Sequence, residues 1–147
     1  SRGEVVINSP EISDAPKIRP NYLSTKEDQD IAVEGLRFTR RIMAAEALRR
    51  FEPTELKPGG QVKSDSELLN SARDLGTTIF HPVGTCKMGR DSMSVVDDQL
   101  RVRGVQNLRV IDASIMPTIT SGNTNAPTVM IAERGADFIK AANRHAR

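Results

Sequence analysis

Residues 108–128 read LRVIDASIMPTITSGNTNAPT, and they decide how the C-terminal part of the chain folds. The apolar run at residues 108–111 ends in small polar residues, as strands do where a ligand sits at the edge of an open α/β sheet. A loop of serine, glycine and asparagine follows at residues 121–125. Pro127 suits the first turn of a helix, because its missing N–H is one that a helix start leaves unpaired anyway. The stretch therefore predicts a strand, a polar loop and a final helix from residue 126 to about residue 143.

Upstream of this stretch, the sequence predicts one more strand and two helices. The β-branched run EVVIN at residues 4–8 indicates an exposed or edge strand, and residues 10–20, with three prolines, indicate an extended connection. A capping box at residues 24–27, STKE, starts a long amphipathic helix that runs to about Phe51. The same spacing recurs in SDSE, residues 64–67, before a second helix that is expected to end at the next glycine.

Composition argues against several classes of protein. A chain of 147 residues with 37% hydrophobic and 27% charged residues is ordinary for a domain with a real core. Aromatic residues make up only 3%, and the net charge of +2 arises from interleaved charges of both signs, which disfavours a nucleic-acid-binding face. No apolar run approaches the roughly 18 residues of a membrane span. A single cysteine permits no internal disulfide, so a reducing, cytoplasmic compartment is expected, with peripheral membrane association left open.

A second stretch, HPVGTCKMG at residues 81–89, holds one of the two histidines and the only cysteine. Zinc needs three or four ligands and this stretch offers two, so no metal site is expected. A nucleophilic Cys86 would need an activating base, for which the neighbouring Lys87 is thin support. Proton transfer by His81 and a purely structural role for it both stay open. Asn125 likewise stands where the N-cap of the final helix would lie, either as a plain cap or beside an anion-binding helix end.

HPVGTCKMG and the later run LRVRGVQNLRVIDASIMPTITSGNTNAPTVMIAERGAD, residues 100–137, together resemble the C-terminal segment of a known family. That family is the glucose–methanol–choline (GMC) family of FAD-dependent oxidoreductases, and the resemblance is nearest to its choline-dehydrogenase-like alcohol dehydrogenases. SRGEVVINSP and PKIRPNYLS resemble the family's substrate-domain strand and its continuation, so the resemblance covers essentially the whole chain. The ordered set of HPVGT, VIDASIMP and NTNAPT makes the resemblance specific.

The resemblance implies an α+β fold, a mixed α/β C-terminal fragment of two parts. Residues 1–80 would be the C-terminal part of a substrate-binding domain, with an antiparallel sheet and two helices. Residues 81–147 would carry a catalytic loop with the last strand and helix of a Rossmann-like FAD-binding domain. The dinucleotide fingerprint G-x-G-x-x-G does not occur in the sequence, so most of the FAD site would lie on the remaining N-terminal part of the enzyme. A fragment divided in this way is expected to expose apolar surface that favours self-association.

The resemblance also implies roles for individual residues. His81 would be the base that takes the proton of an alcohol hydroxyl, while hydride passes from the carbinol carbon to flavin N5. Asn125 matches the family's second active-site position and would hold the substrate oxygen by hydrogen bonding. A helix dipole under the flavin would stabilise the reduced cofactor. The cofactor-binding positions implied are Asp112, Ala113, Asn125, Ala126, Pro127 and Thr128.

Three interpretations follow from these observations. The first is the C-terminal part of an FAD-dependent alcohol or choline-type dehydrogenase that oxidises a primary alcohol, with the isolated chain inactive. The second is a non-catalytic truncated module or assembly fragment of such a protein. The third is a thiol or metal protein centred on Cys86. A glycine-rich FAD fingerprint upstream in the same reading frame would favour the first over the second.

Overall fold

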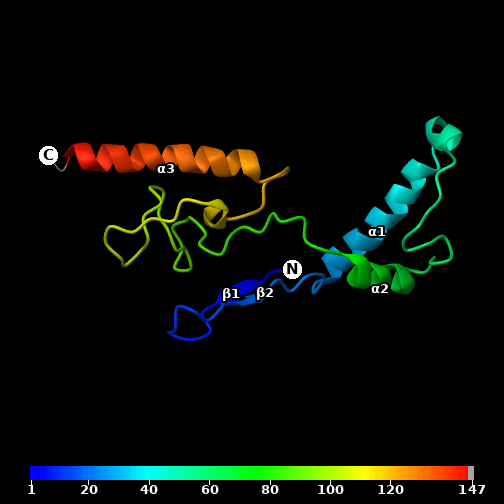
Figure 1. The fold of residues 1–147 in the computed structure, drawn as a ribbon, viewed down its shortest axis with the longest axis horizontal. Coiled ribbons are helices and arrows are strands. Elements are labelled where there is room, and N and C mark those ends of the chain that lie inside the picture. Colours follow the sequence, from blue (N-terminus) through cyan, green and yellow to red (C-terminus); the bar gives the residue numbers. More distant parts are fainter. Residues whose placement is uncertain (146–147) are drawn as a thin grey trace. The chain divides into compact units, whose positions relative to one another are not determined.

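The computed structural model describes residues 1–145 of the chain (Figure 1). The chain divides into two compact units, Ser1–Thr77 and a second unit that begins at Thr78. The described residues are mostly helical and carry one small two-stranded sheet. None of the described helices combines the length and the apolar character needed to cross a membrane.

The sheet of the first unit pairs β1, Glu4–Val6, with β2, Lys17–Arg19. The strands are antiparallel, and the Arg19 guanidinium donates to the carboxylate of its cross-strand neighbour Glu4 at 2.8 Å. The strand predicted from EVVIN is confirmed, although it is shorter than expected. Its partner lies inside the proline-containing segment that the sequence predicts to be an extended connection.

Helix α1, Lys26–Met43, confirms the first predicted helix but not its predicted cap. Thr25 is the N-cap residue, and its hydroxyl accepts from the N–H of Asp28 at 3.3 Å. The prediction of Ser24 as the cap is therefore wrong by one position. The N–H of Ser24 instead donates to the hydroxyl of Ser1 at 3.0 Å. Two adjacent hydroxyl residues allow either register, and the local pattern does not contain the contact with Ser1.

The prediction that this helix runs unbroken to about residue 51 is wrong. Helix α1 stops at Met43, and after two alanines the chain continues as a short 3₁₀ helix, η1, Glu46–Phe51. The loop after η1 returns to α1, where the guanidinium of Arg40 binds the carboxylate of Glu55 at 2.8 Å. We attribute the break to this return of the chain, because alanine is the best helix former and would not end a helix by itself.

Helix α2, Asp65–Leu75, confirms the second predicted capping box. The hydroxyl of Ser64 accepts from the N–H of Glu67 at 3.3 Å, and the carboxylate of Glu67 accepts from the N–H of Ser64 at 3.0 Å. Gly76 is the C-cap residue, as predicted. Helix α2 packs against α1, and its side chain Leu68 is completely buried. These two helices form the small core of the first unit.

The second unit packs one long helix over a set of loops. Helix α3, Asn125–His145, confirms the predicted final helix and begins one residue earlier than expected (Figure 1). Its side chain Ile131 belongs to a buried apolar cluster whose other members come from the loops. Those loop residues are Val96, Leu100, Ile115 and Met116.

Residues 108–111, which the sequence predicts to be a strand, form none in the described chain. Arg109 makes a single antiparallel bridge with Arg101, and the N–H of Val110 donates to the carbonyl of Leu100 at 3.2 Å. A parallel strand needs neighbouring strands to bond with, and the described residues of this unit supply none. The segment therefore pairs with the residues that directly precede it.

A close contact places α3 against the VIDASIMP segment. A Cβ atom added to Gly135 of α3 would lie 2.5 Å from Cγ2 of Ile111, so only glycine permits this approach. Asp112 then leads into a short 3₁₀ helix, η2, Ala113–Ile115, which also contacts α3. Helix α3 and the VIDASIMP segment therefore belong to one packed body.

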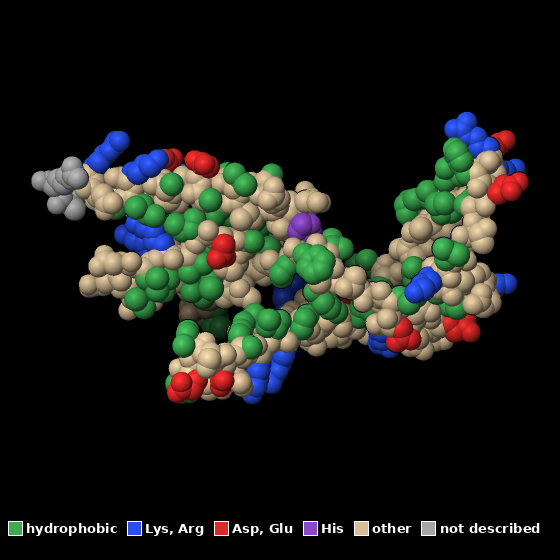
Figure 2. Space-filling model, in the orientation of Figure 1, with side chains coloured by type: hydrophobic (Ala, Val, Ile, Leu, Met, Phe, Trp, Pro, Cys, Tyr) green, Lys and Arg blue, Asp and Glu red, His purple; other side chains and the backbone are tan. Residues whose placement is uncertain are grey.

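Both units expose apolar side chains, as expected from the sequence (Figure 2). On α1, Ile31 and Phe38 are 63% and 55% exposed. In the second unit, Ile79 and Phe80, which directly precede His81, are 75% and 81% exposed. Self-association through such surface stays a prediction.

Candidate functional site

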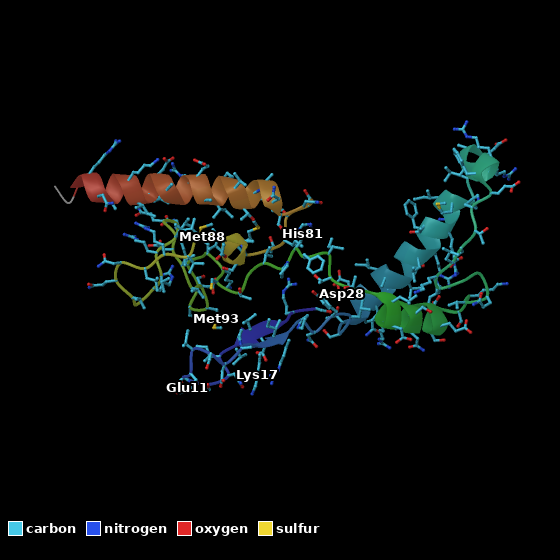
Figure 3. All side chains as sticks on the ribbon, viewed as in Figure 1. Glu11, Lys17, Asp28, His81, Met88 and Met93 are labelled. Atoms are coloured by element: carbon cyan, nitrogen blue, oxygen red, sulfur yellow. The ribbon has the colours of Figure 1, made fainter. Side chains whose placement is uncertain are left out.

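His81 and Thr124 meet although 43 residues separate them in sequence. Nδ1 of His81 lies 2.8 Å from the hydroxyl oxygen Oγ1 of Thr124, which is a hydrogen-bonding distance. Thr124 is buried, with 7% of its surface exposed, and His81 is partly buried. Figure 3 shows His81 beside the first turn of α3. The fold therefore brings the HPVGT and NTNAPT motifs to one place.

Backbone hydrogen bonds tie the loop after His81 to the VIDASIMP segment. The N–H of Cys86 donates to the carbonyl of Ser114 at 3.0 Å, and the N–H of Met88 donates to the carbonyl of Ile115 at 2.7 Å. Residues 114 and 115 belong to η2, which contacts α3. All three motifs that carry the family resemblance are thus connected within the second unit.

Residues close to His81 on either side adopt positive φ angles. Gly84 has a φ of 90°, which L side chains rarely adopt, so this turn favours glycine. Phe80 has a φ of 62°, an uncommon conformation for an aromatic residue, and its N–H donates to the hydroxyl of Thr78 at 3.0 Å. The chain therefore turns sharply before and after His81.

Thr124 is the residue that precedes α3 and accepts its first helical hydrogen bond. The N–H of Thr128 donates to the carbonyl of Thr124 at 3.0 Å, and the Thr128 hydroxyl donates to the same carbonyl at 2.6 Å. The prediction that Asn125 is the N-cap is therefore wrong by one position, because Asn125 is already helical. Asn-Thr-Asn offers three capping residues in a row, so residue type alone does not select among them.

The start of α3 leaves the Thr124 hydroxyl available to His81. A capping hydroxyl usually accepts from the N–H of the second or third helical residue, and Pro127 at the third position has no N–H. The N–H groups of Asn125 and Ala126 lie at the positive end of the helix dipole, where no intrahelical acceptor reaches them. Such an end suits an anionic or carbonyl oxygen of a bound molecule.

Asp112 and Ala113 lie at the start of η2. A carboxylate oxygen of Asp112 accepts from the N–H of Ser114 at 2.8 Å, so the side chain caps η2. Asp112 is exposed, whereas Ala113 is partly buried against the apolar cluster. Because η2 contacts α3, both predicted groups of cofactor-binding residues lie in the same unit.

His81 and Cys86 are not part of a metal centre in the described chain. No three His, Cys, Asp or Glu side chains among residues 1–145 are arranged to hold a metal ion. Cys86 is a free, partly buried cysteine.

In the turn after Cys86, the hydroxyl of Ser94 and the ammonium group of Lys87 lower the pKa of Asp91 to about 2. These contacts stabilise the turn itself, so the lowered pKa has a structural cause.

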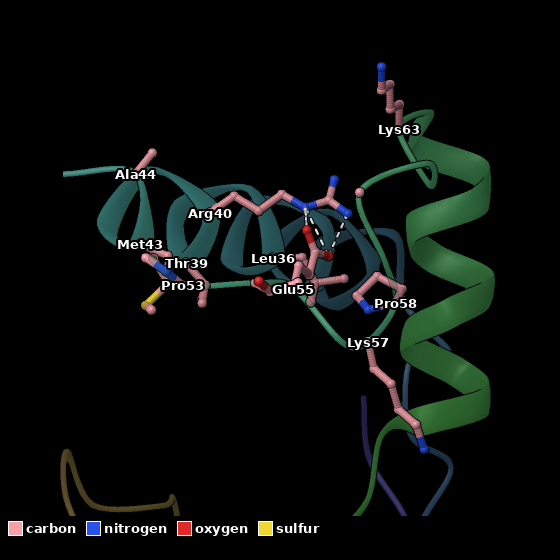
Figure 4. A pocket seen from close by; sticks show the side chains of 12 residues that line it. Leu36, Thr39, Arg40, Met43, Ala44, Pro53, Glu55, Lys57, Pro58 and Lys63 are labelled. Carbon is pink, nitrogen blue, oxygen red and sulfur yellow. Dashed lines mark hydrogen bonds and ion pairs between the residues drawn. The ribbon is translucent and has the colours of Figure 1, made fainter. Parts of the chain in front are cut away.

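An open hollow of about 540 Å³ beside α1 is a second candidate site, in the first unit (Figure 4). The guanidinium of Arg40 binds both carboxylate oxygens of Glu55 there and lowers the pKa of that carboxyl. It also donates to the carbonyls of Val62 at 2.8 Å and Gly59 at 3.1 Å. These contacts use the guanidinium to hold a loop, so the hollow offers no free charge from Arg40 to a ligand.

Comparison with known proteins assigns the chain to a family. Residues 1–132 match the family model described as GMC oxidoreductase. The chain belongs to this family. It is 48% identical over 139 residues to an alcohol dehydrogenase (acceptor) of Pseudomonas putida, and 51% identical over 142 residues to the mitochondrial choline dehydrogenase of Mus musculus. These matches cover 95% of the chain but 25% and 24% of the two relatives, so this GMC chain spans about a quarter of the length of the curated relatives it matches.

Solved structures share the fold of this GMC chain. An FAD-dependent oxidoreductase from Chaetomium thermophilum matches it with a TM-score of 0.89 and 34% identity, over 97% of this chain and 25% of that one. Pyridoxine 4-oxidase from Mesorbium loti matches with a TM-score of 0.82 and 39% identity, over 92% of this chain and 26% of that one. The sequence and structure comparisons agree that this is the C-terminal GMC oxidoreductase region.

The described residues fit part of a flavin site. Members of the GMC family depend on FAD. The first two N–H groups of α3 and the exposed amide of Asn125 are donors of the kind that anionic and carbonyl oxygens of a cofactor require. The fit is partial, because the sequence contains no G-x-G-x-x-G segment for the dinucleotide phosphates.

Sequence reasoning missed Thr124 as a site residue. The available signal is a threonine three positions before Pro127 at a helix start, since that proline removes one usual donor to the capping hydroxyl. The partner of the hydroxyl, His81, is supplied only by the fold.

Proposed function

We propose that this chain is the C-terminal part of an FAD-dependent dehydrogenase that oxidises a primary alcohol, with His81 as the base. The observation that carries the proposal is the hydrogen bond between His81 and Thr124, which places an imidazole beside the N-terminal end of α3. Membership of the GMC family and the likeness to alcohol and choline dehydrogenases support the reaction class.

His81 acts on the hydroxyl of the substrate. With Nδ1–H as the donor to Thr124, Nε2 is the nitrogen left to accept the proton of the alcohol. FAD, when bound, supplies the two-electron acceptor that takes hydride from the carbinol carbon. As the proton moves to His81, the electron pair of the O–H bond forms the carbonyl, so the alcohol becomes an aldehyde and the imidazole becomes cationic.

Asn125 orients the substrate oxygen in this proposal. It is exposed at the first position of α3, and its amide can donate a hydrogen bond to the oxygen but cannot take its proton. Asn123 is exposed on the other side of Thr124. Asn125→Ala and Asn123→Ala, measured side by side, would decide which amide contacts the substrate. Each should slow the reaction less than loss of His81, because an oriented donor is removed and the proton acceptor remains.

The remaining assignments follow the same proposal. FAD would be held by residues at the start of η2 and in the first turn of α3, namely Asp112, Ala113, Asn125, Ala126, Pro127 and Thr128. Residues 1–80 belong to the substrate-binding part and residues 81–147 to the FAD-binding part. Residues 108–111 would gain strand neighbours in the complete FAD-binding sheet.

The second candidate function is a non-catalytic module of the same family. The 147 residues contain no dinucleotide fingerprint, so the upstream reading frame decides between the two candidates. An upstream G-x-G-x-x-G segment in the same reading frame would exclude this candidate. A frame without one would exclude the enzyme.

The proposed function is tested in a chimera, in which this chain replaces the matching C-terminal quarter of a related alcohol dehydrogenase. Reduction of the bound flavin by substrate is followed in a stopped-flow instrument. His81→Gln in this chimera should slow flavin reduction by on the order of 10² to 10⁴-fold, the usual contribution of a positioned base. Arg41→Gln, on the exposed surface of α1, is the matched control and should leave the rate unchanged. A His81→Gln rate close to that of the unmodified chimera would refute the assignment.

A further inference from the structure

We infer that Thr124 is a positioning residue for His81. Its hydroxyl accepts a hydrogen bond from Nδ1–H and so keeps the neutral imidazole in the tautomer whose Nε2 carries the free electron pair. The inference rests on the proposed role of His81 as a base, but it concerns a residue outside the implied set of catalytic and cofactor-binding positions.

The first support is the environment of the Thr124 hydroxyl. The residue is only 7% exposed, and a buried hydroxyl needs a partner inside the protein. Among the described residues, no buried side-chain nitrogen or oxygen lacks a hydrogen-bond partner. For Thr124 the partner is His81 Nδ1 at 2.8 Å, and Pro127 removes the competing N–H of the third helical residue. The hydroxyl therefore serves the imidazole instead of the third N–H of the helix.

The second support is the rigidity of both partners. The carbonyl of Thr124 accepts two hydrogen bonds from Thr128, and β-branching restricts the threonine side chain to few rotamers. Two turns along the same helix, Ile131 enters the apolar cluster. The His81 loop is fixed through the backbone of Cys86. The direction of the hydroxyl is thus set before any substrate arrives, which is what a positioning group requires.

The third support is the chemistry of a neutral partner. A neutral imidazole donates from one nitrogen and accepts at the other, so a bond to Nδ1–H leaves Nε2 as the acceptor. A hydroxyl carries no charge, so it orients the ring without the electrostatic stabilisation of imidazolium that a carboxylate partner provides. A threonine hydroxyl can also donate to an unprotonated Nδ1, so the contact itself fixes the direction of the ring, and the role of His81 as a base requires the form in which Nδ1–H is the donor.

The test reads the tautomer directly. The 147-residue chain is labelled with ¹⁵N-histidine, and long-range ¹H–¹⁵N NMR is recorded at alkaline pH, where imidazole is neutral. His145→Gln removes the second histidine signal and assigns that of His81. We expect the unmodified chain to show mainly the Nδ1–H tautomer. A dominant Nε2–H tautomer in the unmodified chain would overturn the inference before any variant of Thr124 is made.

Three variants then isolate the hydroxyl. Thr124→Val, which keeps the shape without the hydroxyl, should shift the tautomer ratio towards that of free histidine, and Thr124→Ser should retain the native ratio. Ser121→Ala removes an exposed hydroxyl from the loop before α3 and should leave the ratio unchanged. An unchanged ratio in Thr124→Val, or an equal shift in Ser121→Ala, would overturn the inference.

A kinetic measurement in the chimera separates this inference from the proposed function. Thr124→Val should lower kcat for flavin reduction about fivefold with little change in KM, as expected for one neutral hydrogen bond, and Thr124→Ser should restore it. An unchanged kcat in Thr124→Val would overturn the positioning role. A failure of His81→Gln to slow the reaction would instead refute the proposed function, while the tautomer of His81 would still be measured in the chain itself.

Discussion

Gly135→Ala should destabilise the second unit, although the same change usually stabilises a helix. Alanine is favoured over glycine in a helix interior by about 1 kcal/mol. At residue 135, however, the new Cβ would lie 2.5 Å from Cγ2 and 2.8 Å from Cδ1 of Ile111. Overpacking of this kind typically costs about 1–3 kcal/mol. The packing cost exceeds the helix preference, so the net loss of unfolding free energy should be about 1 kcal/mol.

Gly35→Ala provides a matched control in α1. A Cβ atom at Gly35 meets nothing within 4 Å, so only the helix preference acts and the variant should gain up to about 1 kcal/mol. The difference between the two variants isolates the packing cost against Ile111. Amide hydrogen exchange during mild urea denaturation reads each unit separately. Equal stabilisation by the two alanine substitutions would contradict the close contact between α3 and Ile111. The double variant Gly135→Ala with Ile111→Val should recover part of the unfolding free energy that Gly135→Ala loses.

Further expectations concern caps, charges, the thiol and the cofactor. Ser64→Ala removes the capping box of α2 and should cost about 1 kcal/mol in urea unfolding of the first unit; no change would contradict the capping role. The pKa of the Asp91 carboxyl is lowered from 3.8 to about 2, and the largest cause is the hydroxyl of Ser94. The ionised carboxylate therefore stabilises the fold fully above pH 3.8, and this stabilisation is lost as the pH falls towards 2. Asp91→Asn should flatten that part of the curve of unfolding free energy against pH, and an unaltered acid slope would contradict it. Cys86→Ser should leave flavin reduction in the chimera nearly unchanged, because no proposed step uses the thiol; a large loss would revive the thiol interpretation. The isolated 147-residue chain should not retain FAD on gel filtration, and a stoichiometric flavin complex would refute the partial-site reasoning.

Local chemistry predicts the helices well and their exact starts poorly. The box at Ser64 and Glu67 is confirmed because both of its hydrogen bonds lie within one turn of the helix. The cap of α1 is Thr25 and not Ser24, because two adjacent hydroxyl residues allow either register and local spacing does not choose between them. The break after Met43 follows from a loop that returns to α1. Helix propensity therefore predicts the elements, and tertiary contacts decide where they stop.

The candidate site was likewise predictable in its local motifs and not in its long-range contact. Resemblance to the family singles out His81 from its motif, and a short-range rule about proline could have drawn attention to Thr124. The bond between these two side chains spans 43 residues and depends on how α3 packs on the loops. The strand expected at residues 108–111 fails for the opposite reason, because its expected partners are strands that the described chain does not contain.

The contacts of the second unit orient His81, but they leave apolar side chains of that unit exposed. The hydrogen bond between His81 and Thr124 and the backbone hydrogen bonds of the following loop hold His81 by contacts inside the second unit alone. Figure 2 shows apolar side chains beside the histidine, and Phe80, Val129 and Met130 of this unit are 81%, 54% and 59% exposed. Proton and hydride transfer are favoured when a closed site excludes water from the reacting groups. In the proposed enzyme, the rest of the protein would cover this apolar surface, so assembly should exclude water from a histidine that Thr124 already orients.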